Sequence, residues 1–171
     1  TGKPGFTARA TRYSHEENFL TGNREEWHIC EDNPECEWLG ETSSDEMTGH
    51  YFAYGIYYDL VADKKEKEKI AQVVKTITDH ILENNFHLTD VDGIPTTWAN
   101  WEPDLLNNDD RWFYERGTNS LEILSFLKTT YHVTGDEKYN DVFNMLIKKH
   151  HYAMNCMQYK VEDGHVAHID D

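Results

Sequence analysis

Basic residues are scarce in this chain of 171 residues, which has 16 Lys and Arg against 32 Asp and Glu and a formal net charge of −16. A field of that sign repels phosphate backbones and anionic lipid headgroups, which excludes nucleic acid and membrane surfaces as expected partners. The sequence also lacks an apolar run long enough to span a bilayer. The acidic residues are spread along the chain rather than gathered in a tail, so the composition does not indicate disorder.

Cysteine is rare as well, and Cys30, Cys36 and Cys156 are the full set. Cys30 and Cys36 enclose a short loop and could form a disulfide in an oxidising compartment, the alternative being three free thiols. No secretory signal peptide is recognisable, and the chain opens abruptly, as a processed or trimmed protein would. We expect a secreted or periplasmic location.

The first half of the sequence predicts a helical hairpin followed by a β-hairpin. Ser43 and Glu46 have the spacing of a capping box, which starts a helix that ends near residue 63. Apolar and aromatic residues cover nearly all faces of this helix, so we expect it to be an inner, buried helix. The next helix, over residues 64–85, has one apolar stripe and a charged opposite face, as an outer helix would. Asp92-Gly93 then indicates the turn of the β-hairpin.

The same order recurs in the second half. An inner helix over residues 119–133 ends at a Thr-Gly-Asp turn, an outer helix follows, and a second Asp-Gly turn stands at 163–164. The Tyr58 to Asp63 and Tyr131 to Asp136 stretches are 73 residues apart, and the two Asp-Gly turns are 71 apart. Two landmarks that recur at nearly one spacing indicate a structural repeat.

The repeat divides the chain into three parts. We expect an irregular N-terminal segment over residues 1–40, a first repeat over 41–98, and a connecting loop with the second repeat over 99–171. Such a unit cannot bury its faces without neighbours. Both ends read as internal positions of a repeat, so we expect residues 1–171 to form a single partial domain of a larger protein.

Alternating inner and outer helices joined by Thr-Gly-Asp turns resemble the (α/α)6-toroid proteins, a fold used by many glycoside hydrolases and polysaccharide lyases. Residues 41–50 (ETSSDEMTGH) also resemble a motif of uncharacterised bacterial toroid proteins, and the similarity covers about residues 38–171. The resemblance implies an all-α chain of antiparallel helical hairpins, a partial (α/α)-toroid with short β-hairpins after its outer helices. It further implies a carbohydrate-active protein, although toroids host several reactions and non-enzymes.

Acidic residues stand where the two inner helices begin. In a toroid these helices share a direction, so Glu41, Asp45 and Glu115 would gather at one mouth of the barrel. Glycoside hydrolysis needs two carboxyl groups, one of them held protonated, and Asp45 with Glu115 or Glu41 is the candidate pair. The alternative is that acidic residues favour helix N-termini for their dipole alone. His50 is a candidate general base that Glu46 would orient, or else a buried, hydrogen-bonded histidine.

All five tryptophans fall outside the expected helices. Trp98, Trp101 and Trp112 share one connecting stretch and are candidates to line a sugar cleft, since flat rings bind the apolar faces of pyranoses. The alternative is that they anchor this loop to the helices. Arg116 could bind the carboxylate of a uronic acid through its guanidinium fork, or form a surface pair with its acidic neighbour. Asn119 is a further candidate for substrate binding, or only a helix cap.

Metal and cofactor sites are not expected, because no histidine pairing with a carboxylate and no glycine-rich phosphate loop is present. The expected partner is an oligo- or polysaccharide. The rival interpretation is a non-catalytic saccharide-binding or scaffold fragment of a larger protein. An incomplete repeat would also expose apolar terminal helices and self-associate to cover them.

Overall fold

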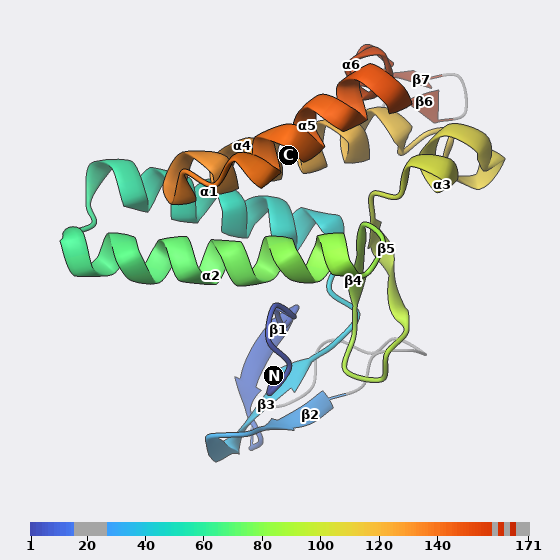
Figure 1. Cartoon of the computed structure of the whole chain (residues 1–171). Coiled ribbons are helices and arrows are strands. Elements are labelled where there is room, and N and C mark those ends of the chain that lie inside the picture. The colour runs from blue at the N-terminus through green and yellow to red at the C-terminus, as the bar shows by residue number, and fades with distance from the viewer. Residues whose placement is uncertain (16–26, 159–160, 163–164, 167–171) are drawn as a thin grey trace.

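Figure 1 shows the computed structural model, which describes residues 1–15, 27–158, 161–162 and 165–166. In chain order the elements are β1 (Ala10–Tyr13), β2 (Trp27–Cys30), β3 (Asn33–Leu39), α1 (Ser44–Leu60), α2 (Lys64–Glu83), β4 (His87–Thr89), β5 (Pro95–Asn100), α3 (Pro103–Asn108), the 3-10 turn η1 (Asp110–Trp112), α4 (Arg116–Thr134), α5 (Glu137–His150), α6 (Tyr152–Asn155), β6 (Val161–Glu162) and β7 (His165–Val166). The four long helices lie together, and the N-terminal strands lie beside the β4–β5 hairpin on one side of them (Figure 1).

The first helical hairpin lies where the sequence predicts it. The capping box is present at the start of α1, where the Glu46 carboxylate accepts the backbone N–H of Ser43 at 2.6 Å. A second capping box, formed by Asp63 and Glu66, starts α2. The apolar stripe of α2 is buried, as an outer helix requires, and includes Ile70, Val74, Ile77 and Ile81.

In the second hairpin, α4 is the most enclosed helix. It begins at Arg116, slightly earlier than predicted, and ends at Gly135, whose φ of 69° is left-handed. The ring of Phe126 stacks on Tyr51 of α1 at 4.1 Å, and the Thr130 hydroxyl lies 2.7 Å from that of Thr78 on α2. Neighbours on two other helices therefore enclose one side of α4.

α1, which was expected to be an inner helix buried on nearly all faces, has only three buried residues, Ser44, Met47 and Tyr51. It runs in the same direction as α4. Near the middle of both helices Tyr51 meets Phe126, and near their C-terminal ends Asp59 accepts a 2.8 Å hydrogen bond from the His132 ring. Contacts that advance together along both helices occur only when the helices are parallel. Their N-terminal ends therefore lie at the same end of the helical layer, next to β5 (Figure 1).

The expected all-α toroid is wrong, because the chain is a mixed α/β structure with antiparallel sheets. Residues 1–40, which we expected to be irregular, contain the three-stranded sheet β1-β3-β2. The strands are short, and β1 alternates partly buried and exposed residues without an apolar run. In a strand only every second side chain needs to pack against the interior. In a segment rich in charged residues this alternation is therefore hard to recognise from the sequence.

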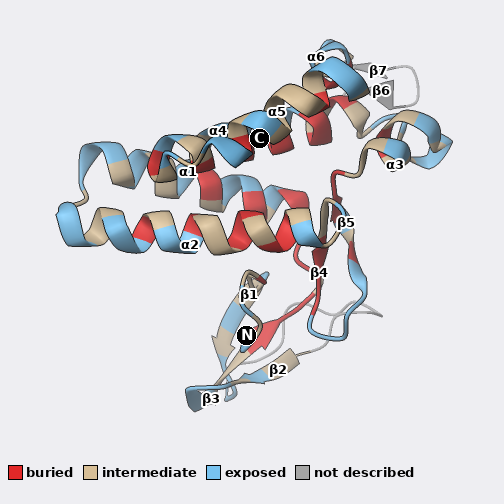
Figure 2. Ribbon diagram, viewed as in Figure 1, coloured by how far each residue is buried: buried red, intermediate tan, exposed pale blue. Residues whose placement is uncertain are grey.

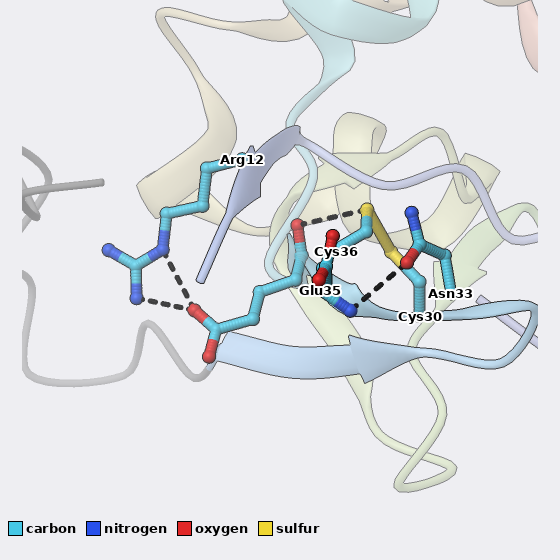
Figure 3. Close-up of a disulfide and its surroundings, with 6 residues drawn as sticks. Arg12, Cys30, Asn33, Glu35 and Cys36 are labelled. Carbon is cyan, nitrogen blue, oxygen red and sulfur yellow. Dashed lines mark hydrogen bonds and ion pairs between the residues drawn. A yellow bond between two sulfur atoms is a disulfide. The ribbon is translucent and has the colours of Figure 1, made fainter. Parts of the chain in front are cut away.

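Cross-strand contacts hold this sheet together, as Figure 3 shows. A disulfide links Cys30 on β2 to Cys36 on β3. The Arg12 guanidinium on β1 donates to the Glu37 carboxylate at 2.7 and 2.9 Å. At the start of β3, the Asn33 side chain accepts the backbone N–H of Glu35 at 3.0 Å. The sequence indicated the possible Cys30–Cys36 pairing, but not the pairing of Arg12 with Glu37, which lie 25 residues apart.

Two further hairpins follow the outer helices, as the sequence predicts. β4 pairs with β5 around the Asp92-Gly93 turn, and β6 pairs with β7, whose predicted turn at 163–164 lies outside the described residues. Figure 2 shows buried residues on α1, α2 and α4, and also in β5 and at the end of β3. Among the helices described, none has the length and apolar character needed to cross a bilayer.

Candidate functional site

A buried carboxyl group lies where the N-terminal ends of α1 and α4 meet β5. Glu122 is in the second turn of α4 and is 7% exposed. The indole N–H of Trp101, directly after β5, donates to Glu122 Oε2 at 2.8 Å, and Trp101 itself is fully buried. Side chains of Ser44 and Thr48 on α1 also reach Glu122. We call Glu122, Trp101, Ser44, Thr48 and nearby Asp45 the carboxyl junction.

The surroundings of Glu122 favour its protonated form. Burial raises its pKa to about 7, the Trp101 hydrogen bond opposes that rise, and the charge of Asp45 adds to it. The side-chain hydrogen bonds of Ser44 and Thr48 to Glu122 also lower its pKa, so they oppose the effect of burial as well.

Asp45 supplies the second carboxyl group of the junction. It stands in the first turn of α1 and is exposed, whereas Glu122 is buried. Two neighbouring carboxyl groups in unlike environments keep different protonation states, which is the arrangement that acid–base chemistry uses. Asp45 is a residue the sequence singled out, and its neighbour in the structure is Glu122.

Glu41 ties the loop before α1 to β5. Its carboxylate accepts the backbone N–H of Thr97 at 3.1 Å and the Thr97 hydroxyl at 2.7 Å. Its own N–H donates to the buried Asp90 side chain at 2.8 Å. Glu41 has a left-handed φ of 54°. This conformation is unfavourable for any residue other than glycine, and the hydrogen bonds of Glu41 hold it in place. Glu41 thus fixes the strand that carries Trp98.

Glu115 and His50 lie at other points on the inner helices. Glu115 is the half-buried residue before α4, and its carbonyl oxygen accepts the backbone N–H of Asn119. The His50 ring stacks on Tyr54 at 5.9 Å. Burial lowers the pKa of His50, and the charge of Glu46 opposes this. The Glu46 carboxylate binds Ser43 in the capping box, so its action on His50 is through charge.

The three candidate tryptophans divide into two roles. Trp98 is 57% exposed, and its ring meets that of half-buried Trp112 at 6.3 Å and 64°. These two rings form an aromatic pair on the connecting stretch. Trp101 faces the interior, where it packs edge-on against Phe126 and holds Glu122.

Arg116 and Asn119 join the connecting stretch to α4. The Arg116 guanidinium donates to the carbonyl oxygens of Leu106 and Asn107 at the end of α3. Asn119 is buried and donates its side-chain N–H to the Asn100 carbonyl oxygen at 2.9 Å. The Arg116 bonds satisfy carbonyl oxygens at the C-terminal end of α3, which have no partner within the helix.

Sequence reasoning missed Glu122, which it placed only as a residue near the start of the inner helix over residues 119–133. The available signal was its position, since it is an acidic residue between Leu121 and Ile123 in the most apolar stretch of the helix. A charged residue at such a place is rarely buried unless it is paired. Its partner Trp101 lies 21 residues away, in a segment whose packing the sequence does not specify.

Comparison of the chain with protein-family models, with curated proteins and with solved structures finds no match.

Proposed function

We propose that the chain is a carbohydrate-active protein that cleaves glycosidic bonds, with Glu122 as proton donor and Asp45 as the partner carboxyl group. The observation that carries this proposal is the unequal pair at the carboxyl junction. Glu122 is enclosed and bound to Trp101, and Asp45 beside it is exposed. Acid and base roles divide between two carboxyl groups in this way in glycoside hydrolysis.

Each group has a defined task in the proposed reaction. Glu122 gives its proton to the glycosidic oxygen as the bond from that oxygen to the anomeric carbon breaks. Asp45 takes a proton from the water molecule that attacks this carbon, or attacks it directly and is released by water in a second step. Both routes consume one water molecule and leave one new reducing end. The stereochemistry of the product distinguishes them.

The aromatic pair supports a saccharide as the ligand. Trp98 is exposed on β5, three residues before Trp101, and it meets Trp112 edge to face. Exposed indole rings pack on the apolar faces of pyranoses. The bonds from Glu41 to Thr97 hold the same strand, so the pair stands on an anchored support.

An extracellular or periplasmic location fits this proposal. The Cys30–Cys36 disulfide is compatible with an oxidising compartment, where polysaccharides are encountered.

The test is a cleavage assay on neutral polysaccharides such as xylan and on acidic ones such as polygalacturonate, read as new reducing ends. We expect Glu122→Gln and Asp45→Asn each to lose about 100-fold or more of the activity, the range general acid–base groups contribute. Glu68→Gln, on the exposed face of α2, is the matched control and should keep it. Wild-type turnover by Glu122→Gln with an unchanged circular dichroism spectrum would reject the proton donor. Products with unsaturated uronate ends, in place of the ends that hydrolysis leaves, would indicate a lyase.

A non-catalytic saccharide-binding role is the second candidate, and the exposed Trp98–Trp112 pair favours it because that pair needs neither carboxyl group. Titration calorimetry with the same polysaccharides separates the two functions. Binding that Trp98→Ala weakens and Glu122→Gln leaves intact, without any cleavage by the wild type, would select the binding role.

A further inference from the structure

One face of α1 is apolar and open to solvent. Its largest members are Phe52, 71% exposed, Ile56, 47%, and Leu60, 76%. Their spacing of four residues places them in one row along the helix. Gly49, Ala53 and Tyr57 form an adjoining row with the same spacing. We call the two rows together the α1 face, and all six residues are exposed. A contiguous apolar surface of this kind marks a site of association.

The internal repeat shows that the fold covers part of the equivalent surface on α4. Residues 73 positions after Gly49, Ala53, Tyr57 and Leu60 are the buried Glu122, Phe126, Thr130 and Val133, whereas those after Phe52 and Ile56 are exposed Ser125 and half-buried Thr129. Tyr51 of α1 stacks on Phe126, and Thr78 of α2 bonds to Thr130. Within the described residues, the first repeat has no such cover on α1.

Of the two parallel helices α1 and α4, the surface that better matches the α1 face is the α1 face of a second copy. The outward side of α4 offers exposed Leu121 followed by Ser125, Lys128 and His132, which would leave charged and polar groups against apolar ones. The α1 face has no charged residue. We propose that two copies of this chain associate through their α1 faces, with the helices antiparallel and crossing at Ala53.

Shape supports the antiparallel arrangement. With Ala53 at the crossing point, Gly49 of one copy lies opposite Tyr57 of the other. A residue without a side chain then receives the largest ring of the row. The small residues let the two helix backbones approach at the centre, while Phe52 and Ile56 fill the flanks.

Charge supports it as well. Asp45 stands at the N-terminal end of α1, and Lys64 and Lys65 follow its C-terminal end as the first residues of α2. The antiparallel arrangement brings Asp45 of each copy to the Lys64 and Lys65 of the other. These two pairings oppose the general repulsion between chains that each carry a net charge of −16.

The face is small, so the dimer is weak. From Gly49 to Leu60 the helix is about 18 Å long, and a contact of that length falls below the roughly 1,200 Å² of stable interfaces. We therefore expect an equilibrium between monomer and dimer that shifts with protein concentration and weakens with salt.

Sedimentation equilibrium of the purified chain over about 1 μM to 1 mM tests the proposal. The wild type is expected to dimerise within this range, while Ile56→Glu and Phe52→Ser raise the dissociation constant by about 10-fold or more. Val73→Glu, an exposed apolar residue on α2, is the control and keeps the wild-type constant. Circular dichroism confirms that each variant is folded. A wild type that stays monomeric throughout, or a dimer that Ile56→Glu and Phe52→Ser leave intact, overturns the proposal.

A charge swap tests the orientation. Lys64→Glu with Lys65→Glu is expected to weaken the dimer, and adding Asp45→Lys to that variant is expected to restore it. Restoration requires the two ends to meet and supports the antiparallel pairing. If Asp45→Lys leaves the weakened association unchanged or weakens it further, the antiparallel pairing is wrong.

Discussion

The indole N–H of Trp101 donates a 2.8 Å hydrogen bond to the Glu122 carboxyl group, and both side chains are buried. This bond stabilises the ionised form of Glu122, but desolvation disfavours that form by more, so the pKa rises to about 7. The bond therefore holds the carboxyl group in a fixed position without forcing it to ionise. A positioned acid that stays protonated near neutral pH is what the proposed reaction needs.

The raised pKa of Glu122 predicts how stability depends on pH. Between the ordinary value of 4.5 and about 7, the folded chain holds a proton that the unfolded chain releases. Folding is therefore favoured less as the pH rises through this window. Glu122→Gln resembles the protonated acid and does not titrate. Relative to the wild type, we expect this variant to gain up to roughly 3 kcal/mol in free energy of unfolding between pH 4.5 and 7.

Urea denaturation of both proteins at a series of pH values measures this difference. Glu68→Gln, on the exposed face of α2, should show no comparable trend with pH. A difference between Glu122→Gln and the wild type that stays constant from pH 4.5 to 7 would mean that Glu122 ionises normally in the folded chain.

Asp79 predicts a second, independent effect, because it connects α2 to α5. Its carboxylate accepts from Lys138 at 2.6 Å, from the Tyr139 hydroxyl at 2.7 Å and from Lys75 at 2.7 Å. Burial acts to raise the pKa of Asp79, but these hydrogen bonds together lower it. The stabilisation is therefore present above the ordinary pKa of 3.8 and is lost as the pH falls below it.

We expect Asp79→Asn to reduce the free energy of unfolding by about 1–3 kcal/mol at pH 7, as a lost charge-assisted hydrogen-bond centre does. Asp141→Asn, exposed on α5, is the control and should change little. Chemical denaturation at pH 7 and at pH 3 measures both. The loss should shrink at the lower pH, and a loss equal at both pH values would argue against the charged network.

The helices were predictable because their signals are local. The Ser43–Glu46 capping box and the left-handed Gly135 each depend on a few neighbouring residues, and both are where the sequence indicates. The N-terminal sheet was not predictable in this way. The spacing of Cys30 and Cys36 indicated that they could pair, but the sheet also depends on pairs such as Arg12 with Glu37, which only the fold brings together.

The same distinction between local and long-range signals applies to the candidate site. Asp45 was recognisable because a helix start is a local feature. Glu122 was not, because its importance comes from burial by Trp101 and by the hydroxyl groups of α1. Trp101 was expected to face a ligand, and loop residues offer no periodic pattern that tells an inward ring from an outward one. Trp98, three residues earlier, is exposed on the strand.

Two glycines with the same backbone conformation predict how tightly the N-terminal segment is packed. Gly5 and Gly93 have φ values of 83° and 84°, so a Cβ strains the backbone equally at both. At Gly93 a Cβ would meet nothing within 4 Å. At Gly5 it would overlap the His80 side chain and lie 2.7 Å from the Thr76 carbonyl oxygen.

We expect Gly93→Ala to cost about 1–2 kcal/mol from the left-handed backbone alone. Gly5→Ala should cost a further 1–3 kcal/mol or so, because the clash displaces His80 from the Thr89 N–H that it accepts at 3.2 Å. Urea denaturation of the two variants gives the difference directly, since the backbone contribution cancels. If the two variants lost equal free energies of unfolding, the segment before β1 would not pack tightly against α2. His80 and the start of the β4–β5 hairpin would then keep their positions without contact from that segment.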